Sequence, residues 1–370
     1  MWGVKRRTKK SIVSSSLLIG LIIIYFLMGI STLYERPIVE LVDIKHVEEI
    51  VVNADNSDVA VDVIYDVTFK ARLENTKHRG ETLTMQYTYS DSAPYHSAFD
   101  VGDKVFVTLR EGSILTAEVI EVKRDQEVLI LFSLFLLIML VVGQRQGLFA
   151  VLSLIFHVSI MAGAIYLFIA RPGTSLLLLM GIAAIFMTVV SLIFVSGLTK
   201  KTLSAILSTL TGLALMMTIT LLVLRLTNQQ GLRFEEMGLL TRHPDAVFTA
   251  GLLIGAIGAV MDVAVTIGST LFQIKEEHPM INTKSLVASG RRIGQDIMGT
   301  MTTIVFFAYI SGTIPTLLIY LLNDASLGYS LSMNFSLELV RALSSGIGIV
   351  LTIPVSILFA VLLTKVGEAT

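Results

Sequence analysis

The feature that most constrains this chain is a series of apolar stretches of membrane-crossing length. A helix needs roughly 17–25 apolar residues to cross about 30 Å of hydrocarbon. Composition agrees, because 54% of the residues are hydrophobic and only 15% are charged, which is more apolar than a soluble domain requires. The sequence therefore predicts an α-helical polytopic membrane protein with about eight transmembrane helices, at residues 14–33, 127–143, 148–169, 175–196, 203–225, 247–272, 299–322 and 340–364.

The distribution of Lys and Arg predicts the orientation. The chain starts with the basic run "KRRTKK", and the following apolar stretch is long and lacks a small-residue cleavage site, so we expect an uncleaved anchor. With a cytoplasmic N-terminus, alternation leaves chiefly Arg171, Arg233 and Arg242 on the outside. The positive-inside rule thus predicts that both termini are cytoplasmic, because alternation then also places on the inside Arg145, Lys200, Lys201, Lys275, Lys284, Arg291, Arg292 and Lys365.

Residues 34–126 form the large polar insertion, which this alternation places outside the cell. Its segments "VAVDVIYDVTFKARL", "GETLTMQYTYS", "KVFVTLRE" and "ILTAEVIEVK" are rich in Val, Thr, Ile and Tyr and are separated by turn signals. We expect a small extracytoplasmic β-domain that forms a partial barrel. The predicted organisation is a cytoplasmic start and first anchor at 1–33, this β-domain at 34–126, and a seven-helix bundle at 127–370. The pattern leaves open whether the β-domain binds a partner or covers the bundle.

One carboxylate lies in the middle of an apolar stretch, "GLLIGAIGAVMDVAVTIGST" at 251–270. An isolated charge there costs about 2.5–3.5 kcal/mol even on the lenient insertion scale. Gly251, Gly255, Gly258 and Asp262 share one helical face, on which the glycines allow another helix to approach closely. The glycines are expected to serve in helix packing, and Asp262 is expected to face protein or water as a transport or binding residue.

A carboxylate buried in this way needs a partner or a proton, because desolvation opposes its charge. His157, in the stretch 148–169, is a candidate to share a proton or a cation with Asp262, and an ordinary hydrogen bond between helices is an equal alternative. Asp296 follows Arg291 and Arg292 at the expected cytoplasmic mouth of the seventh span. The alternatives are topological anchoring for the arginines and a helix N-terminal position for Asp296.

Proline and the missing motifs narrow the function classes. Pro315 and Pro354 are expected to kink or break the last two spans, as in transporters that use broken helices. The sequence contains no cysteine, no phosphate-binding Gly-Lys-Ser/Thr loop, no His-Glu-x-x-His helix and no nucleophile elbow. We therefore expect no enzyme activity, no metal or other cofactor and no nucleic-acid partner; the expected surroundings are membrane lipid.

Several segments resemble a known family. "GAIGAVMDVAVTIGS", "SGRRIGQDIMGTM" and the tyrosine of "FFAYISGTIP" are similar to the core signature of the YibE/F family of polytopic bacterial membrane proteins. Upstream, "GETLTM", "VGDKVFV" and "GQRQGLFAVLSL" resemble its extracytoplasmic β-region and the following helix pair. The resemblance covers the chain from about residue 60 onward. It implies a location in the bacterial plasma membrane, often beside a related companion membrane protein, and it implies no particular activity or substrate.

Two hypotheses of different classes follow. The first is a secondary transporter or permease component, with Asp262 as the intramembrane coupling or binding carboxylate and Asp296 with its arginines at the cytoplasmic entrance. The second is a non-transporting envelope scaffold or sensor whose β-domain binds a partner. Neither hypothesis identifies a substrate.

Overall fold

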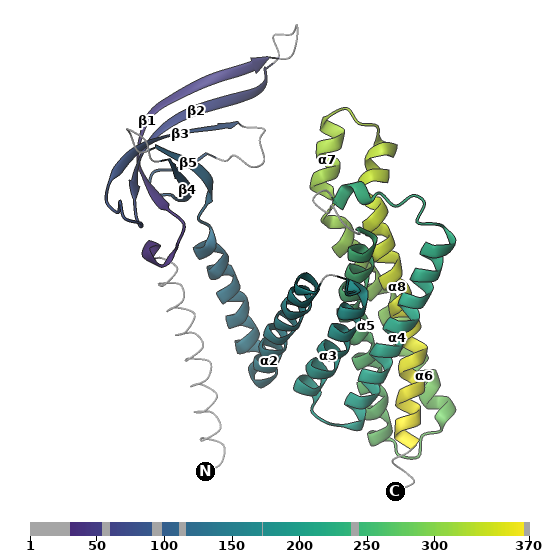
Figure 1. Ribbon diagram of the computed structural model, residues 1–370. Coiled ribbons are helices and arrows are strands. Elements are labelled where there is room, and N and C mark those ends of the chain that lie inside the picture. Colours follow the sequence, from purple (N-terminus) through teal and green to yellow (C-terminus); the bar gives the residue numbers. More distant parts are fainter. Residues whose placement is uncertain are drawn as a thin grey trace, which may run out of the picture. The chain divides into compact units, whose positions relative to one another are not determined.

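The computed structural model describes residues 30–53, 60–90, 98–110, 116–171, 173–237 and 244–365. These residues form two compact units, one ending at Gly147 and the other beginning at Leu148. Figure 1 shows a curved sheet in the first unit and a helical bundle in the second. Of the predicted first span, residues 14–29 lie outside the described residues, and its end contains a short 3-10 helix, η1 (Ser31–Leu33).

The sheet has five antiparallel strands in the order β3-β2-β1-β4-β5. The edge strands β3 and β5 also lie close to each other, so the sheet curves into a half-barrel. The predicted partial barrel is therefore confirmed. The strands are β1 (Ile38–Asn53), β2 (Ala60–Leu73), β3 (Thr82–Ser90), β4 (Lys104–Arg110) and β5 (Thr116–Val122).

The central strand β1 is absent from the strands that the sequence pattern predicts. Its pairing with β2 shifts register between Leu41 and Asp43 and again between Ile44 and His46. Each shift interrupts the two-residue alternation that identifies a strand in the sequence. The charged residues in its second half further obscure the alternation. The sequence of β1 therefore does not predict a strand by itself, and its pairing with β2 and β4 establishes the strand.

The interior of the half-barrel is a single apolar cluster. Strand β3 alternates strictly, with Leu83, Met85 and Tyr87 buried between exposed neighbours. They pack with residues of β1, β2 and β4 and with Phe99, whose ring centroid lies 4.3 Å from that of Tyr87. This cluster holds the strands together without disulfides.

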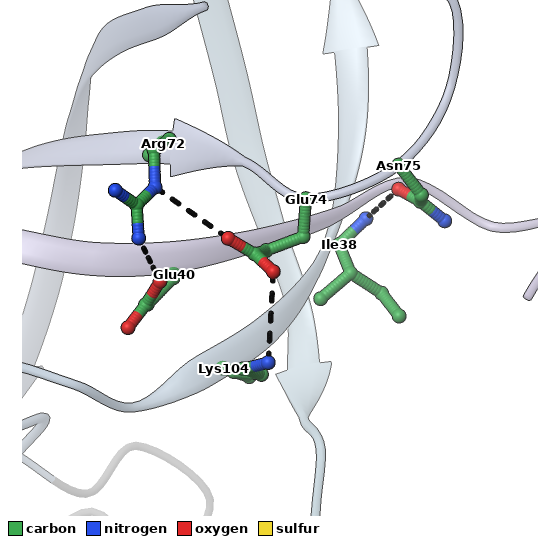
Figure 2. Close-up of polar contacts among 6 residues, drawn as sticks. All are labelled: Ile38, Glu40, Arg72, Glu74, Asn75 and Lys104. Atoms are coloured by element: carbon green, nitrogen blue, oxygen red, sulfur yellow. Dashed lines mark hydrogen bonds and ion pairs between the residues drawn. The ribbon is translucent and has the colours of Figure 1, made fainter. Parts of the chain in front are cut away.

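A group of charged side chains joins three strands at one end of the half-barrel (Figure 2). Arg72 Nη2 donates to Glu40 Oε2 at 2.6 Å, and Arg72 Nε lies 3.5 Å from Glu74 Oε1. Lys104 Nζ lies 3.6 Å from the other oxygen of Glu74. The hydrogen bond from Arg72 holds the pKa of the Glu40 carboxyl below its usual range. Each carboxylate of this group thus has a cationic partner.

Beside these ion pairs, Asn75 is buried and its amide is fully used. Its oxygen accepts from the backbone N–H of Ile38 at 2.8 Å, as Figure 2 shows. Its nitrogen donates to the carbonyls of Tyr34 at 3.0 Å and Arg36 at 2.7 Å. Three hydrogen bonds therefore fix the segment that enters β1.

Tyr34 links the start of the β-domain to its end. Its hydroxyl donates to Asp125, the first residue of α2, and Lys123 Nζ lies 2.7 Å from the same carboxylate. Burial raises the pKa of Tyr34 to about 12, and the hydrogen bond to Asp125 adds to this effect. The chain therefore enters and leaves the β-domain at one anchored point.

Six described helices are long and apolar enough to cross a membrane. They are α2 (Asp125–Ala170), α3 (Leu176–Ser196), α4 (Lys200–Leu226), α5 (Pro244–Glu277), α6 (Thr283–Ser311) and α8 (Leu327–Lys365). The second unit, which begins within α2, also contains a short helix, α7 (Ile314–Leu322), and a 3-10 turn, η2 (Phe234–Met237). The multi-pass membrane character is supported; the total of about eight spans stays a prediction.

Two predicted spans, 127–143 and 148–169, both fall in α2. The helix is interrupted at Gln144, where φ is 49° and ψ is −120°. Three residues later the backbone passes so close to the preceding segment that a glycine is required, because a Cβ at Gly147 would lie 2.2 Å from the carbonyl oxygen of Met139. The sequence "GQRQG" therefore marks the break between two helical segments.

The predicted span 299–322 differs most from the structure. Helix α6 begins at Thr283, capped by the side chain of Asn282, and ends at Ser311, and α7 starts at Ile314. The expected break occurs just before Pro315, which stands in the first turn of α7 where a missing N–H is tolerated. In contrast, α8 continues through Pro354. Helix α6 begins earlier than predicted because its charged first half is helical and packs on α8 through Gly290 and Gly294.

Helix α5 lies at the centre of the second unit and packs against α3, α4, α6 and α8 (Figure 1). Half of its membrane-length window is buried, whereas only 6% of the corresponding window of α6 is buried. The buried side of α5 repeats every three or four residues, as expected for a core helix, and includes Leu252, Ala256, Val260, Val263, Ile267 and Leu271.

Candidate functional site

The glycine face of α5 points toward α6 and α8. A Cβ added to Gly255 would lie 2.0 Å from the hydroxyl oxygen of Tyr309 on α6, so the missing side chain admits the phenol. A Cβ on Gly251 would lie 3.9 Å from Arg341 Nη2 of α8, whereas one on Gly258 would meet open space. The three glycines thus form a narrow face, occupied by polar side chains at one end and open further along.

Asp262 continues this face one turn beyond Gly258, and its side chain is exposed. It makes no hydrogen bond or ion pair with any described residue. Seven residues separate it from Gly255, close to two helical turns, so it lies on the side of α5 that faces Tyr309. The chain therefore presents an unpaired carboxylate about halfway along an apolar helix.

The exposed side of α6 carries the second predicted group. Arg291, Arg292 and Asp296 are all exposed, and within the described residues none of them forms an ion pair. Asp296 lies more than three turns after the start of α6, which removes the alternative of a helix N-terminal carboxylate.

The opposite side of α6 packs tightly on α8. A Cβ on Gly294 would lie 2.3 Å from Ile353 Cγ2, and one on Gly290 would lie 2.8 Å from Ile357 Cγ1. Small residues therefore bring the two helices together and turn the polar side of α6 outward.

His157 has a different environment. Its Nε2 lies 3.2 Å from the carbonyl oxygen of Met187 on α3, in hydrogen-bonding range. Nearby, Ser153 donates to Ser191 across the same pair of helices at 2.8 Å. No described hydrogen bond or ion pair joins His157 to Asp262, so the contact that the structure gives His157 is with a neighbouring helix.

A cavity of about 240 Å³ lies beside the break between α6 and α7. Arg341 and Glu338 of α8 form an ion pair in its wall, with side chains that are 22% and 19% exposed. The guanidinium carbon of Arg341 lies 5.2 Å from the ring centroid of Phe248 on α5. The lining consists of Met237, Gly312, Thr313, Thr316, Asn334, Leu337, Glu338 and Arg341.

Sequence reasoning missed this cavity and its ion pair. Glu338 precedes the predicted span 340–364, so it reads as a loop residue, and Arg341 reads as an end-of-span charge. The usable signal is the spacing in "LELVRAL", where an acid and a base three residues apart stand among apolar residues. Their neighbours at 312–316 come from another helix and leave no signal in the local sequence.

Two polar groups lie between the cavity and the middle of α6. The hydroxyl of Tyr309 and that of Thr302 are buried and have no hydrogen-bond partner among the described residues. Arg341 against Gly251, Tyr309 against Gly255 and exposed Asp262 form a line of polar groups along the glycine face of α5, whereas Thr302 lies against Gly346 of α8. The distance along the helix from Gly251 to Asp262 is about 16 Å.

Within the described residues, no group of three or more His, Cys, Asp or Glu side chains could hold a metal ion. The chemistry that this site offers is therefore that of a carboxylate, an ion pair and hydroxyl groups. Such groups bind and release protons, small ions or polar solutes.

Comparison with known proteins identifies two family regions. The family model described as YibE/F-like protein matches residues 131–366, and that described as YibE/F family N-terminal domain matches residues 32–122. No curated protein and no solved structure matches the chain. The two matches cover the helical and the β-rich parts and confirm the resemblance seen in the sequence. The chain belongs to the YibE/F family.

Proposed function

We propose that this chain is a secondary transporter or permease component and that Asp262 is its coupling or binding carboxylate. The observation that carries the proposal is the unpaired carboxylate in the middle of an apolar helix. A charge at that position is expensive in hydrocarbon, so its retention favours a role in ion or solute movement. A purely structural aspartate would have its oxygens satisfied by neighbouring donors.

The surroundings of Asp262 support the same function. The glycines of α5 leave space along one face, and polar groups follow that face from the ion pair of Arg341 to Tyr309 and then to Asp262. The break between α6 and α7 lies at the end of this line, and broken helices are a common source of binding groups in transporters. A solute or ion entering at the cavity would meet a continuous series of polar partners.

The orientation is part of the proposal. With both termini cytoplasmic, the cavity lies at the outer end of the bundle, and Asp296 with Arg291 and Arg292 lies near the inner end. The exposed side of α6 would then serve as the cytoplasmic entrance. We place the protein in the bacterial plasma membrane, where a related companion membrane protein is the proposed partner.

The test is ion flux in proteoliposomes that contain either a pH-sensitive or a sodium-sensitive dye. Proton and sodium influx would be driven by an imposed membrane potential. Wild-type protein is expected to carry one of these ions, and Asp262→Asn is expected to reduce its influx to that of protein-free vesicles. Asp245→Asn is the matched control, because Asp245 is an exposed aspartate in the first turn of the same helix. Equal flux through Asp262→Asn and wild type would exclude the coupling role.

A second candidate function is an envelope scaffold or sensor without transport. The observation that favours it is the set of exposed apolar side chains along β1, namely Val42, Ile44, Val47 and Ile50. Exposed apolar side chains on a long strand pair are suited to binding another protein. Deleting residues 38–123 separates the two functions. Flux through the truncated protein supports transport. The scaffold is supported if the wild-type protein carries no flux and if a partner binds the complete chain but not the truncated one.

A further inference from the structure

The cavity beside the α6–α7 break has the composition of a binding site. Its walls come from α7, α8, the connection between α6 and α7, and η2, so distant parts of the second unit converge on it. Thr313 and Thr316 belong to the start of α7, and Asn334, Glu338 and Arg341 follow one another along α8. Two opposite charges, an amide and two hydroxyls therefore surround one small space.

The ion pair in this wall is only partly satisfied by the protein. Arg341 Nη1 donates to Glu338 Oε1, and the guanidinium packs on Phe248. Arg341 Nε is buried and has no partner among the described residues. An ion pair in an apolar setting is costly unless further hydrogen bonds complete it. Arg341 Nη2 also makes no hydrogen bond with a described residue, so the guanidinium has a donor left for a ligand.

We propose that this cavity binds a small zwitterion of the class of neutral α-amino acids. The lining residues carry one positive and one negative charge, so a ligand with a net charge would leave the site as a whole with one uncompensated charge. A zwitterion places its carboxylate toward Arg341 and its ammonium toward Glu338. Neither charge is then left alone.

The remaining groups fit the same ligand. Thr313 Oγ1 already donates to the carbonyl of Ile310, so its oxygen can accept from an ammonium. Asn334 Nδ2 donates to the carbonyl of Ser330, which leaves the amide oxygen as an acceptor. A volume of about 240 Å³ is below the roughly 300–1,000 Å³ of drug-sized sites, as suits a small ligand.

This inference rests on the proposed function for its purpose, since the cavity would be the loading site of the path that leads to Asp262. Binding can nevertheless be measured without flux. The first experiment is equilibrium binding of L-alanine, L-serine and L-leucine to the purified full-length protein in detergent. Propionate, which lacks the ammonium, and alaninamide, which lacks the carboxylate, are the matched ligands. At least one amino acid should bind about tenfold or more tightly than either analogue, because each analogue brings a net charge into a site whose own two charges already sum to zero.

The second experiment tests whether removing one charge from the cavity wall changes which kind of ligand the protein prefers. Glu338→Gln should weaken amino-acid binding and strengthen propionate binding, because Arg341 is then uncompensated. Arg341→Gln should weaken amino-acid binding and strengthen alaninamide binding. Asp245→Asn is the control and should leave binding unchanged, because Asp245 is an exposed aspartate in the first turn of α5 that does not line the cavity. Loss of stability without a change in preference would mean that the ion pair serves structure alone.

The failures of the two proposals are distinguishable. Wild-type protein that binds none of the three amino acids, or binds propionate equally well, overturns the inference even when ion flux through Asp262 is present. Amino-acid binding with the predicted exchange of preference, in a protein that carries no flux, supports the cavity and overturns the transport function. Should both cavity variants fail to fold, the wild-type comparison of the three kinds of ligand decides.

Discussion

The β-domain and the helical unit differ in how they treat polar groups. In the β-domain, Glu40 and Glu74 have cationic partners, and the buried amide of Asn75 uses its oxygen and its nitrogen. In the helical unit, Asp262 and Asp296 have no partner among the described residues. Satisfied polar groups maintain a fold, whereas unsatisfied ones in a membrane need another explanation. The unpartnered carboxylates of the helical unit are therefore the groups available for function.

The largest predicted effect tests the structural role of the β-domain's polar groups. Asn75→Ala removes three hydrogen bonds and leaves the Ile38 N–H and two carbonyls unpaired, at about 1 kcal/mol or more for each bond, so we expect a loss of roughly 3 kcal/mol. Hydrogen exchange of residues 38–41 in the full-length protein measures it. Asn75→Asp keeps the acceptor and should cost less. Unchanged exchange in Asn75→Ala would show that the amide is not structural.

The next effect tests whether shape, rather than charge, holds the helical unit together. Gly294→Ala places a methyl group 2.3 Å from the branched side chain of Ile353, and such overpacking costs about 1–3 kcal/mol. Gly299→Ala is the matched control on the same helix, since a Cβ there meets open space. The midpoint temperature of thermal unfolding in detergent should fall for Gly294→Ala and should not change for Gly299→Ala. Equal midpoints would contradict the close contact of α6 with α8.

A smaller effect concerns pH and the ion pairs of Figure 2. The pKa of Glu40 is lowered in the folded state, so its contribution to stability is present above its usual pKa of 4.5 and is lost as the pH falls through the lowered value. Hydrogen exchange of β1 and β2, measured across this acid range, should speed up at the low end. Glu40→Gln should remove that pH-dependent part. An unchanged pH profile in this variant would mean that Arg72 does not stabilise Glu40.

The smallest effect concerns Asp262 and stability. Because this side chain is exposed and unpaired within the described chain, Asp262→Asn should change the free energy of unfolding in detergent by about 0.5 kcal/mol or less. Asn75→Ala, measured beside it, provides the contrast between a polar group used for folding and one available for function. A loss of several kcal/mol in Asp262→Asn would reveal a structural partner and would remove the difference between the two regions.

Several features followed from the sequence because they depend on neighbouring residues alone. The apolar windows locate α3, α4 and α5, and the alternation of "GETLTMQYTYS" locates β3. Proline predicted the break before α7, since a missing N–H and a fixed φ act within one turn. The family motifs also lie in continuous segments. Hydrophobic length, two-residue alternation and proline chemistry are local properties, so the sequence by itself determined them.

Other features depended on the tertiary structure. Strand β1 owes its central place to pairing with β2 and β4, and α6 extends back to Thr283 because its glycine side packs on α8. The exposure of Asp262, the contact of His157 with α3 and the cavity at Arg341 arise from residues far apart in the chain. The sequence indicated which polar residues were unusual. Only packing decided which of them have partners, because hydrogen-bond partners and burial are set by neighbours in space.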